Sequence, residues 1–122
     1  MRQDKIHIPA AIPFSSELLA LEKVQMLKVL EEAAETTEAW KDWQKGKAEK
    51  RQFVDETADL IQALVNLLAV SDVSDEDLVK AMQRCCSRNG AKGRLAKGWK
   101  DEKEQFEMLD SHDKKVKCQC HS

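Results

Sequence analysis

Apolar residues recur at helical spacing along most of this chain, and the pattern predicts an all-α protein. The first predicted helix runs from Glu17 to about Gln44, with Ser15 or Ser16 as the N-cap and Gly46 as the C-cap. Its inward positions are predicted to be Leu18, Leu21, Val24 or Gln25, Leu27 or Lys28, Leu30, Ala34 and Thr37.

A second helix is predicted from about Lys50 to Val70, and it is apolar over more than one side. One stripe consists of Val54, Ala58, Ile61, Val65 and Leu68, and it is widened by Leu60, Ala63, Leu64 and Leu67. A single neighbouring helix cannot cover so broad a face, so we expect a second subunit to cover the rest.

A third helix is predicted from about Asp75 to Arg88, with Leu78, Val79, Met82 and Cys86 facing inward. The expected fold is therefore an antiparallel helical hairpin plus a third helix, oligomerising into a core like a four-helix bundle. We expect an N-terminal arm over residues 1–14 and an all-α domain over residues 15–99. Residues 100–122 are expected to hold a short helix and a polar tail whose composition predicts disorder.

Composition and charge agree with a helical domain and exclude some classes of partner. The chain has 122 residues with four Gly and two Pro, so it predicts one helix-rich domain. A net charge of −2 does not indicate a nucleic-acid partner. No membrane partner is expected either, because the start of the chain lacks an apolar signal region and Gln62 and Asn66 interrupt its longest apolar run. The four cysteines form a poor disulfide framework, so we expect reduced thiols and a cytoplasmic protein.

Two short segments, EEAAE at 31–35 and DETAD at 55–59, concentrate acidic residues. Helical geometry places Glu31, Glu32 and Glu35 on one face, and Glu56 and Asp59 on one face of the next helix. Both groups lie at similar distances from the predicted turn, so they are expected to face each other across the hairpin. Facing carboxylates repel unless a cation lies between them, and an oxygen-only ligand set suits Mg²⁺ or Mn²⁺. The alternative is that each acidic face is simply solvated.

The paired pattern EExxE and ExxD resembles the signature of the MazG-like all-α nucleoside triphosphate pyrophosphatases. That superfamily includes the dimeric dUTPases and the phosphoribosyl-ATP pyrophosphohydrolases, and the likeness covers about residues 17–98. The resemblance implies a homodimer or dimer of dimers that uses Mg²⁺, with Mn²⁺ as a substitute. It implies metal ligands at Glu32, Glu35, Glu56 and Asp59 and catalytic roles for Glu31 and Glu35. In that role Glu31 is a further ligand or the group that orients the attacking water.

The segment RNGAKGR at 88–94 is a candidate for contacts to substrate phosphates. Asn89, Lys92 and Arg94 resemble phosphate-contacting positions of the family, although basic residues at a helix C-terminus also complement the helix dipole. Trp40 is a candidate for stacking on a base, with core or dimer packing as the alternative for it and for Trp43 and Trp99. The cluster Cys118, Cys120 and His121 lacks a fourth ligand and does not predict a zinc site.

The resemblance thus implies a Mg²⁺-dependent nucleotide pyrophosphohydrolase that cleaves between the α and β phosphates, giving a nucleoside monophosphate and pyrophosphate. One expected role is removal of non-standard or surplus (d)NTPs, and hydrolysis of phosphoribosyl-ATP is the alternative. A non-catalytic helical dimerisation or regulatory module also accounts for the pattern. A di-iron or di-manganese bundle is set aside, because the three histidines, His7, His112 and His121, lie outside the predicted helices.

Overall fold

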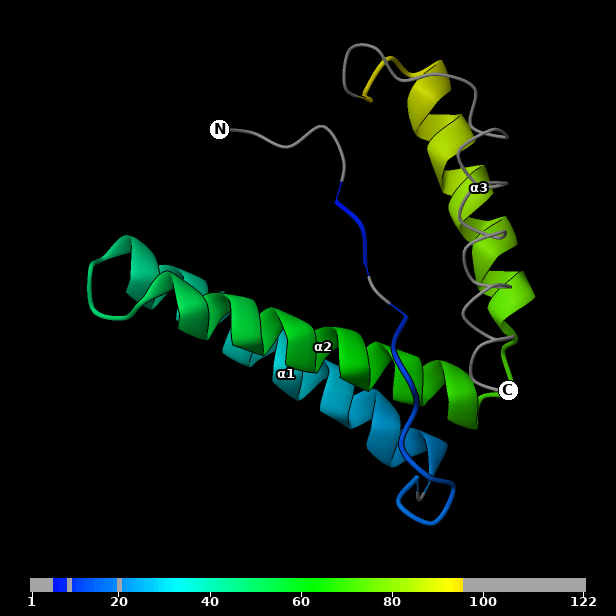
Figure 1. Ribbon diagram of the computed structural model, residues 1–122, viewed down its shortest axis with the longest axis horizontal. Helices are drawn as coiled ribbons and strands as arrows, with labels where there is room; N and C mark the ends of the chain where they lie inside the picture. Colours follow the sequence, from blue (N-terminus) through cyan, green and yellow to red (C-terminus); the bar gives the residue numbers. More distant parts are fainter. Residues whose placement is uncertain (1–5, 9, 20, 96–122) are drawn as a thin grey trace, which may run out of the picture. The chain divides into compact units, whose positions relative to one another are not determined.

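The computed structural model describes residues 6–8, 10–19 and 21–95, and within these ranges it contains three α-helices and no strand. They are α1 (Glu22–Gln44), α2 (Lys50–Val70) and α3 (Asp75–Ala91), shown in Figure 1. The chain divides into two compact units: Ala11–Ser74 carries α1 and α2, and Met1–Ala10 with Asp75–Ser122 carries α3. The predicted all-α class is confirmed for the described residues.

Helices α1 and α2 form an antiparallel hairpin (Figure 1). The end of α1 is closed by Gly46, which has φ 73° and donates its N–H to the Trp43 carbonyl at 3.0 Å. The next N–H, from Lys47, reaches the Asp42 carbonyl at 2.8 Å, which completes a Schellman motif. Gly46 is thus the helix-ending residue that the sequence predicts, at a positive φ that favours glycine. Across the hairpin, Trp43 stacks on Phe53 with ring centroids 5.7 Å apart.

The start of α1 differs from the prediction. The helix begins at Glu22, five residues later than expected, and its N-cap is Leu21, with no side-chain cap hydrogen bond. Upstream, the Ser15 carbonyl accepts the N–H groups of Leu18 and Leu19 at 2.9 and 3.2 Å. That local turn occupies the serine region, so the predicted serine cap of the long helix is wrong.

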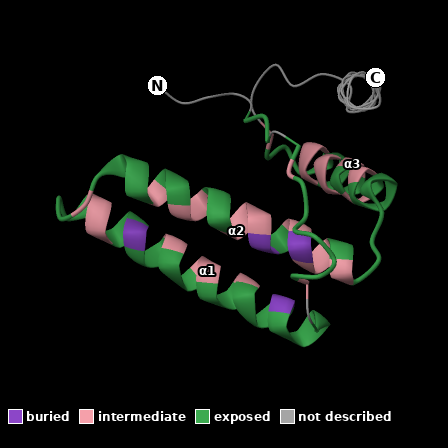
Figure 2. Cartoon of the chain, turned by 60° about the horizontal axis from the view of Figure 1, so that its bottom comes forward, coloured by how far each residue is buried: buried purple, intermediate pink, exposed green. Residues whose placement is uncertain are grey.

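The predicted inward positions of α1 are confirmed only in part: Gln25 is buried, whereas the leucines are not. The buried residues are Gln25 and Ala39 on α1 and Ala63 and Asn66 on α2. Figure 2 shows buried positions, in purple, on both helices. The predicted inward leucines are exposed instead: Leu18 by 69%, Leu21 by 71%, Leu27 by 59% and Leu30 by 58%. The hairpin therefore turns its leucine-rich side outward.

On α2 the predicted stripe is only partly covered. Ile61, Val65 and Leu68 are half-buried, whereas Val54 and Ala58 are exposed. This face is still open in the described chain, as expected if one neighbouring helix cannot cover it.

An extended segment ahead of α1 is tied to α2 by two amide side chains. The Phe14 N–H donates to Asn66 Oδ1 at 2.9 Å, and Gln62 Nε2 donates to the Ile12 carbonyl at 2.9 Å. Gln62 also donates to Asn66 Oδ1 at 3.1 Å. Between the two anchored residues lies Pro13, which has no N–H to satisfy and disfavours helix at the residue before it. These contacts hold residues 12–14 against the apolar half of α2.

Helix α3 extends to Ala91, three residues beyond the predicted end at Arg88. It closes with the same motif as α1: Gly93 has φ 67°, and the Arg94 N–H donates to the Asn89 carbonyl at 3.0 Å. No residue of α3 is buried, and two of its predicted inward residues, Leu78 and Met82, are 39% and 47% exposed.

In the described part of the chain, no helix combines the length and apolar character needed to cross a membrane. The predicted short helix and tail after residue 100, together with Trp99, Cys118, Cys120 and His121, lie outside the described residues.

Candidate metal centre

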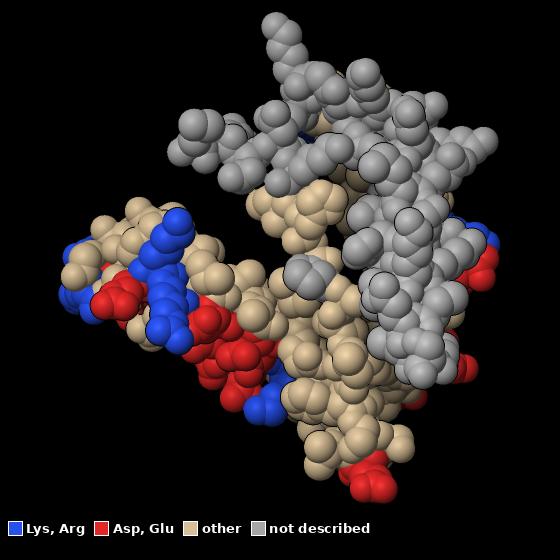
Figure 3. Space-filling model, viewed as in Figure 1, with Lys and Arg blue, Asp and Glu red and all other residues tan. Residues whose placement is uncertain are grey.

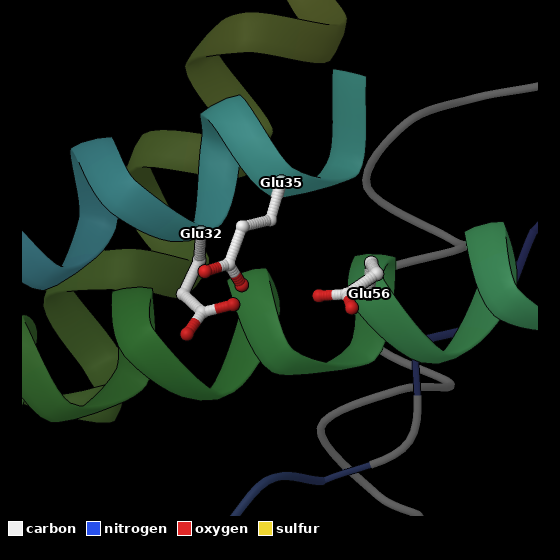
Figure 4. Close-up of side chains that lie close together, drawn as sticks. All are labelled: Glu32, Glu35 and Glu56. Atoms are coloured by element: carbon white, nitrogen blue, oxygen red, sulfur yellow. The ribbon is translucent and has the colours of Figure 1, made fainter. Parts of the chain in front are cut away.

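Three carboxylates from the two helices of the hairpin converge on one point. Glu32 and Glu35 extend from α1 and Glu56 extends from α2, and one oxygen from each lies within 4.8 Å of the others (Figure 4). A separation of three residues keeps Glu32 and Glu35 about 60° apart around α1, so both reach toward α2. The short turn at residues 45–49 then brings Glu56 to the same height. Figure 3 shows acidic side chains gathered on this part of the hairpin.

Two oxygens of this group are buried without a hydrogen-bond partner among the described residues. They are Oε2 of Glu32 and Oε2 of Glu56, both on half-buried residues, whereas Glu35 is exposed. Buried polar atoms in native proteins are nearly always paired, because an unpaired one loses its hydration without compensation. Among the described residues, nothing therefore offsets the hydration that these two oxygens lose.

Burial and like charge act together on the same two groups. Burial, followed by the hydrogen bond and the charge of Glu35, raises the pKa of Glu32 above its ordinary value. Burial, followed by the charges of Glu35 and Asp59, raises the pKa of Glu56. Both ionised forms are thus disfavoured in the folded protein, and a nearby cation would reverse this.

The two other predicted acids lie outside the group of three. Asp59 is exposed, but its charge contributes to the raised pKa values of Glu32 and Glu56, which places it near the cluster. Glu31 points to a different neighbour, with its Oε2 3.3 Å from Lys28 Nζ in a half-exposed ion pair. The structure therefore brings together three of the five acids that the sequence singles out.

The donor set fits a hard divalent cation. Its three ligand atoms are carboxylate oxygens, and hard cations such as Mg²⁺ and Mn²⁺ prefer oxygen to nitrogen or sulfur. A few carboxylates suffice for Mg²⁺, because water and substrate phosphates complete its octahedral shell. Next to Glu56 lies an open hollow of about 420 Å³ lined by Ala48, Glu49, Arg51, Gln52, Asp55 and Glu56.

Most of the chain matches one known protein family. The matching family is described as phosphoribosyl-ATP pyrophosphohydrolase, and the match covers residues 1–85. The chain belongs to this family. Phosphoribosyl-ATP pyrophosphohydrolases are members of the MazG-like all-α superfamily, so the resemblance predicted from the acidic motifs is confirmed. Comparison with curated proteins and with solved structures gives no match.

The family match includes every acidic residue of the candidate site and ends before the predicted phosphate contacts. Asn89, Lys92 and Arg94 belong to the unit that carries α3. Within that unit Asn89 Nδ2 lies 3.4 Å from Cys85 Sγ, and Arg94 Nη1 lies 3.5 Å from Asn89 Oδ1. Asn89 is helical rather than part of a loop, and its hydrogen bonds are local. The substrate role of these three residues stays a prediction.

The tryptophans of the hairpin differ in environment. Trp43 stacks on Phe53, as expected for a packing residue. Trp40 is 48% exposed on α1, and its predicted role in stacking on a base stays a prediction.

Three polar residues of the hairpin have roles that the sequence pattern did not reveal. Thr36 donates toward two carbonyls, one on each helix, and Gln62 and Asn66 hold the segment before α1. The sequence does contain a signal for the two amides, since polar residues four apart in an apolar run lie on one face of a helix and need hydrogen-bond partners there. Thr36 gave no such signal, because a hydroxyl at this position forms its inter-helix contact only once α2 packs beside it.

Proposed function

We propose that this chain is a Mg²⁺-dependent nucleotide pyrophosphohydrolase that cleaves between the α and β phosphates to give a nucleoside monophosphate and pyrophosphate. The observation that carries the proposal is the convergence of Glu32, Glu35 and Glu56, with two buried oxygens unsatisfied, in a chain of a pyrophosphohydrolase family. Exposed acidic faces are common without metals, but solvation does not explain the unsatisfied oxygens.

Each acid has a distinct place in this proposal. Glu32, Glu35 and Glu56 hold Mg²⁺, and Asp59, beside them, joins the ligand set or binds through water. When bound, the cation supplies neutralisation of phosphate oxygens and a lowered pKa for a bound water. Glu31 is the group that orients the attacking water, after release from Lys28, or a further ligand. Phosphoryl transfer needs little beyond such positioning and charge stabilisation.

Two substrates share the bond that this site would cleave. The family description favours phosphoribosyl-ATP. The acidic motifs equally fit nucleoside triphosphates, with removal of non-standard or surplus (d)NTPs as the role. In either case Asn89, Lys92 and Arg94 are the proposed phosphate contacts, and Trp40 the proposed base contact.

We also propose that the working form is a homodimer or a dimer of dimers with a helical-bundle core. The apolar residues buried in the described part of the chain are two alanines, Ala39 and Ala63, which is little for an independent fold. The outward leucines of α1, including Leu27 and Leu30, supply an apolar face for a second copy. Sedimentation equilibrium should therefore show at least a dimer, and Leu27→Glu should shift it toward monomer.

Product analysis tests the enzymatic proposal directly. The full chain is incubated with phosphoribosyl-ATP or a panel of (d)NTPs, with Mg²⁺ or with chelator, and pyrophosphate and orthophosphate are scored separately. Metal-dependent pyrophosphate release that is absent in Glu35→Gln supports the proposal and identifies the substrate. No turnover across the panel and no Mn²⁺ binding would favour the non-catalytic helical module.

A further inference from the structure

A single hydroxyl lies between α1 and α2 at the level of the carboxylates. Thr36 Oγ1 is 2.7 Å from the Glu32 carbonyl oxygen on its own helix and 3.0 Å from the Glu56 carbonyl oxygen on α2. Its one proton can be shared between these two acceptors in a three-centre hydrogen bond. Both carbonyls belong to residues whose side chains meet in the acidic cluster. The hydroxyl thus links the main-chain positions from which two of the three carboxylates extend.

We propose that Thr36 is a positioning residue for the acidic site: its bridge fixes the separation and register of α1 and α2 where Glu32 and Glu56 face each other, so that their carboxylates share one cation. The statement about the cation rests on the proposed function. The statement about the separation of the helices does not.

Such a bridge opposes a force that the site itself creates. The carboxylates of Glu32, Glu35 and Glu56 repel one another, and this repulsion favours a wider separation of the two helices. Thr36 is part-buried, where a hydrogen bond is stronger than in water. The bridge therefore restrains the helices most directly at the height where they are pushed apart.

The two distances distinguish a hydroxyl from a methyl group at this position. Both are hydrogen-bond distances, and a carbon atom approaches a carbonyl oxygen only to about 3.3–3.6 Å. Valine has nearly the shape of threonine, so Thr36→Val would force α2 away by several tenths of an ångström. Thr36→Ala removes the bond and leaves space, and Thr36→Ser keeps the hydroxyl. The expected order of disturbance is Val, then Ala, then Ser.

Two other threonines of the hairpin provide matched controls. Thr37 Oγ1 donates to the Ala33 carbonyl at 2.9 Å, and Thr57 Oγ1 donates to the Phe53 carbonyl at 2.8 Å. Each bond stays within one helix, four residues back along the chain. Thr57 is also part-buried, like Thr36. Valine at either control position loses the same kind of back-bond without affecting a link between the helices.

The first measurement is Mn²⁺ binding to the full chain by electron paramagnetic resonance, at a temperature where thermal unfolding shows each variant to be folded. Thr36→Val should weaken binding by roughly 10- to 100-fold, the usual loss when an outer-shell partner of a metal site is removed. Thr36→Ser, Thr37→Val and Thr57→Val should stay within about twofold of the wild type. A role limited to general stability would lower the melting temperature of Thr57→Val and Thr36→Val alike and leave both affinities unchanged.

The second measurement needs no metal. Amide hydrogen exchange of the metal-free protein is followed by NMR at Thr36 and at Leu60, whose N–H is the ordinary helical donor to the Glu56 carbonyl. Exchange at both sites should rise on the order of tenfold in Thr36→Val and stay unchanged in Thr37→Val. Unchanged exchange in Thr36→Val would overturn the bridge. If the wild type binds no Mn²⁺, the proposed function and the shared cation both fail, and the exchange data alone decide whether Thr36 holds the helices.

Discussion

Two groups of polar side chains lie at buried or partly buried positions of the same hairpin, and they differ in whether their polar atoms have hydrogen-bond partners. Gln62 and Asn66 find partners within the chain: Asn66, only 4% exposed, accepts two hydrogen bonds through Oδ1, and Gln62 reaches a main-chain carbonyl. Glu32 and Glu56 each keep a buried oxygen with no partner in the described chain. The amide pair thus stabilises the fold through hydrogen bonds within the chain. The two glutamates have the unsatisfied polar atoms that are typical of a binding site.

The difference follows from the chemistry of the groups. An amide carries both donors and an acceptor, so amides can pair with each other and with the main chain. Ionised carboxylates only accept, and a cluster of them cannot satisfy itself. When such a cluster is brought together by the fold, its missing partner has to be a proton or a cation.

The largest expected effect comes from neutralising one acid of the cluster. Glu56→Gln removes a ligand charge but keeps the size of the side chain, so we expect turnover to fall by at least about a thousandfold, equivalent to roughly 4 kcal/mol of transition-state stabilisation. Pyrophosphate release with Mg²⁺ measures this effect, and circular dichroism should show unchanged helicity. Retained turnover would remove Glu56 from the catalytic site, and lost helicity would assign it a structural role.

The amide pair should respond in the opposite way. Asn66→Ala leaves the Phe14 N–H and the Gln62 amide without their shared acceptor, which should lower the free energy of unfolding by about 1–3 kcal/mol. Urea denaturation measures the loss, and Gln52→Ala, at an exposed amide of the same helix, should stay within about 0.5 kcal/mol. Mn²⁺ affinity of Asn66→Ala should remain close to that of the wild type. A large loss of affinity would mean that the two groups are coupled.

The raised pKa values predict a specific dependence of stability on pH in the absence of metal. Because the pKa of Glu32 is raised in the folded state, the folded protein holds this proton at pH values where the unfolded chain has lost it. The stability associated with that proton is present below the ordinary value of 4.5 and is lost as the pH rises through the raised pKa.

Glu32→Gln isolates this contribution, because glutamine resembles the protonated acid and does not titrate. Thermal unfolding of metal-free protein should show the variant to be more stable than the wild type at pH 7, with the gap closing toward pH 4.5. Saturating Mg²⁺ should raise the stability of the wild type at pH 7 and reduce the gap. A gap that is independent of pH would contradict the raised pKa.

The smallest effect is expected at the exposed ion pair of Lys28 and Glu31, which are each 54% exposed in their side chains. Lys28→Ala should change the free energy of unfolding by no more than about 1 kcal/mol, since solvent screens such pairs. Chemical denaturation at low and high salt measures it, and the small difference should shrink further at high salt. A salt-independent loss well above this range would indicate a contact other than the ion pair.

The sequence predicted what depends on local geometry. The spacing of Glu32, Glu35 and Glu56 and the short turn at Gly46 were sufficient to predict that carboxylates of two helices meet, because helical period and turn length are set within a few residues. The same argument placed α2 correctly at Lys50–Val70.

What the sequence did not predict depends on how the helices face each other. Hydrophobic periodicity identifies a helix face that favours burial, but it does not identify the element that covers that face. The leucines of α1 are therefore predicted to face inward, whereas in the single chain they are exposed. The role of Thr36 was hidden for the same reason, since its second acceptor is on another helix. The predicted start of α1 was wrong because a serine favours a short turn as well as a helix N-cap, and here the Ser15 carbonyl belongs to a separate turn before the helix.

The short turn of the hairpin also has a kinetic consequence. The bridge from Thr36 to Glu56 joins residues only 20 apart in the sequence. Closing so short a loop is faster and loses less conformational entropy than forming contacts between distant segments. The hairpin can therefore form early, and the carboxylates would meet before much of the remaining chain is in place. On the metal-binding proposal, repulsion among them would already oppose the folding transition state. A divalent cation would then speed folding as well as slow unfolding, so the ion would help to assemble the site in which it later acts.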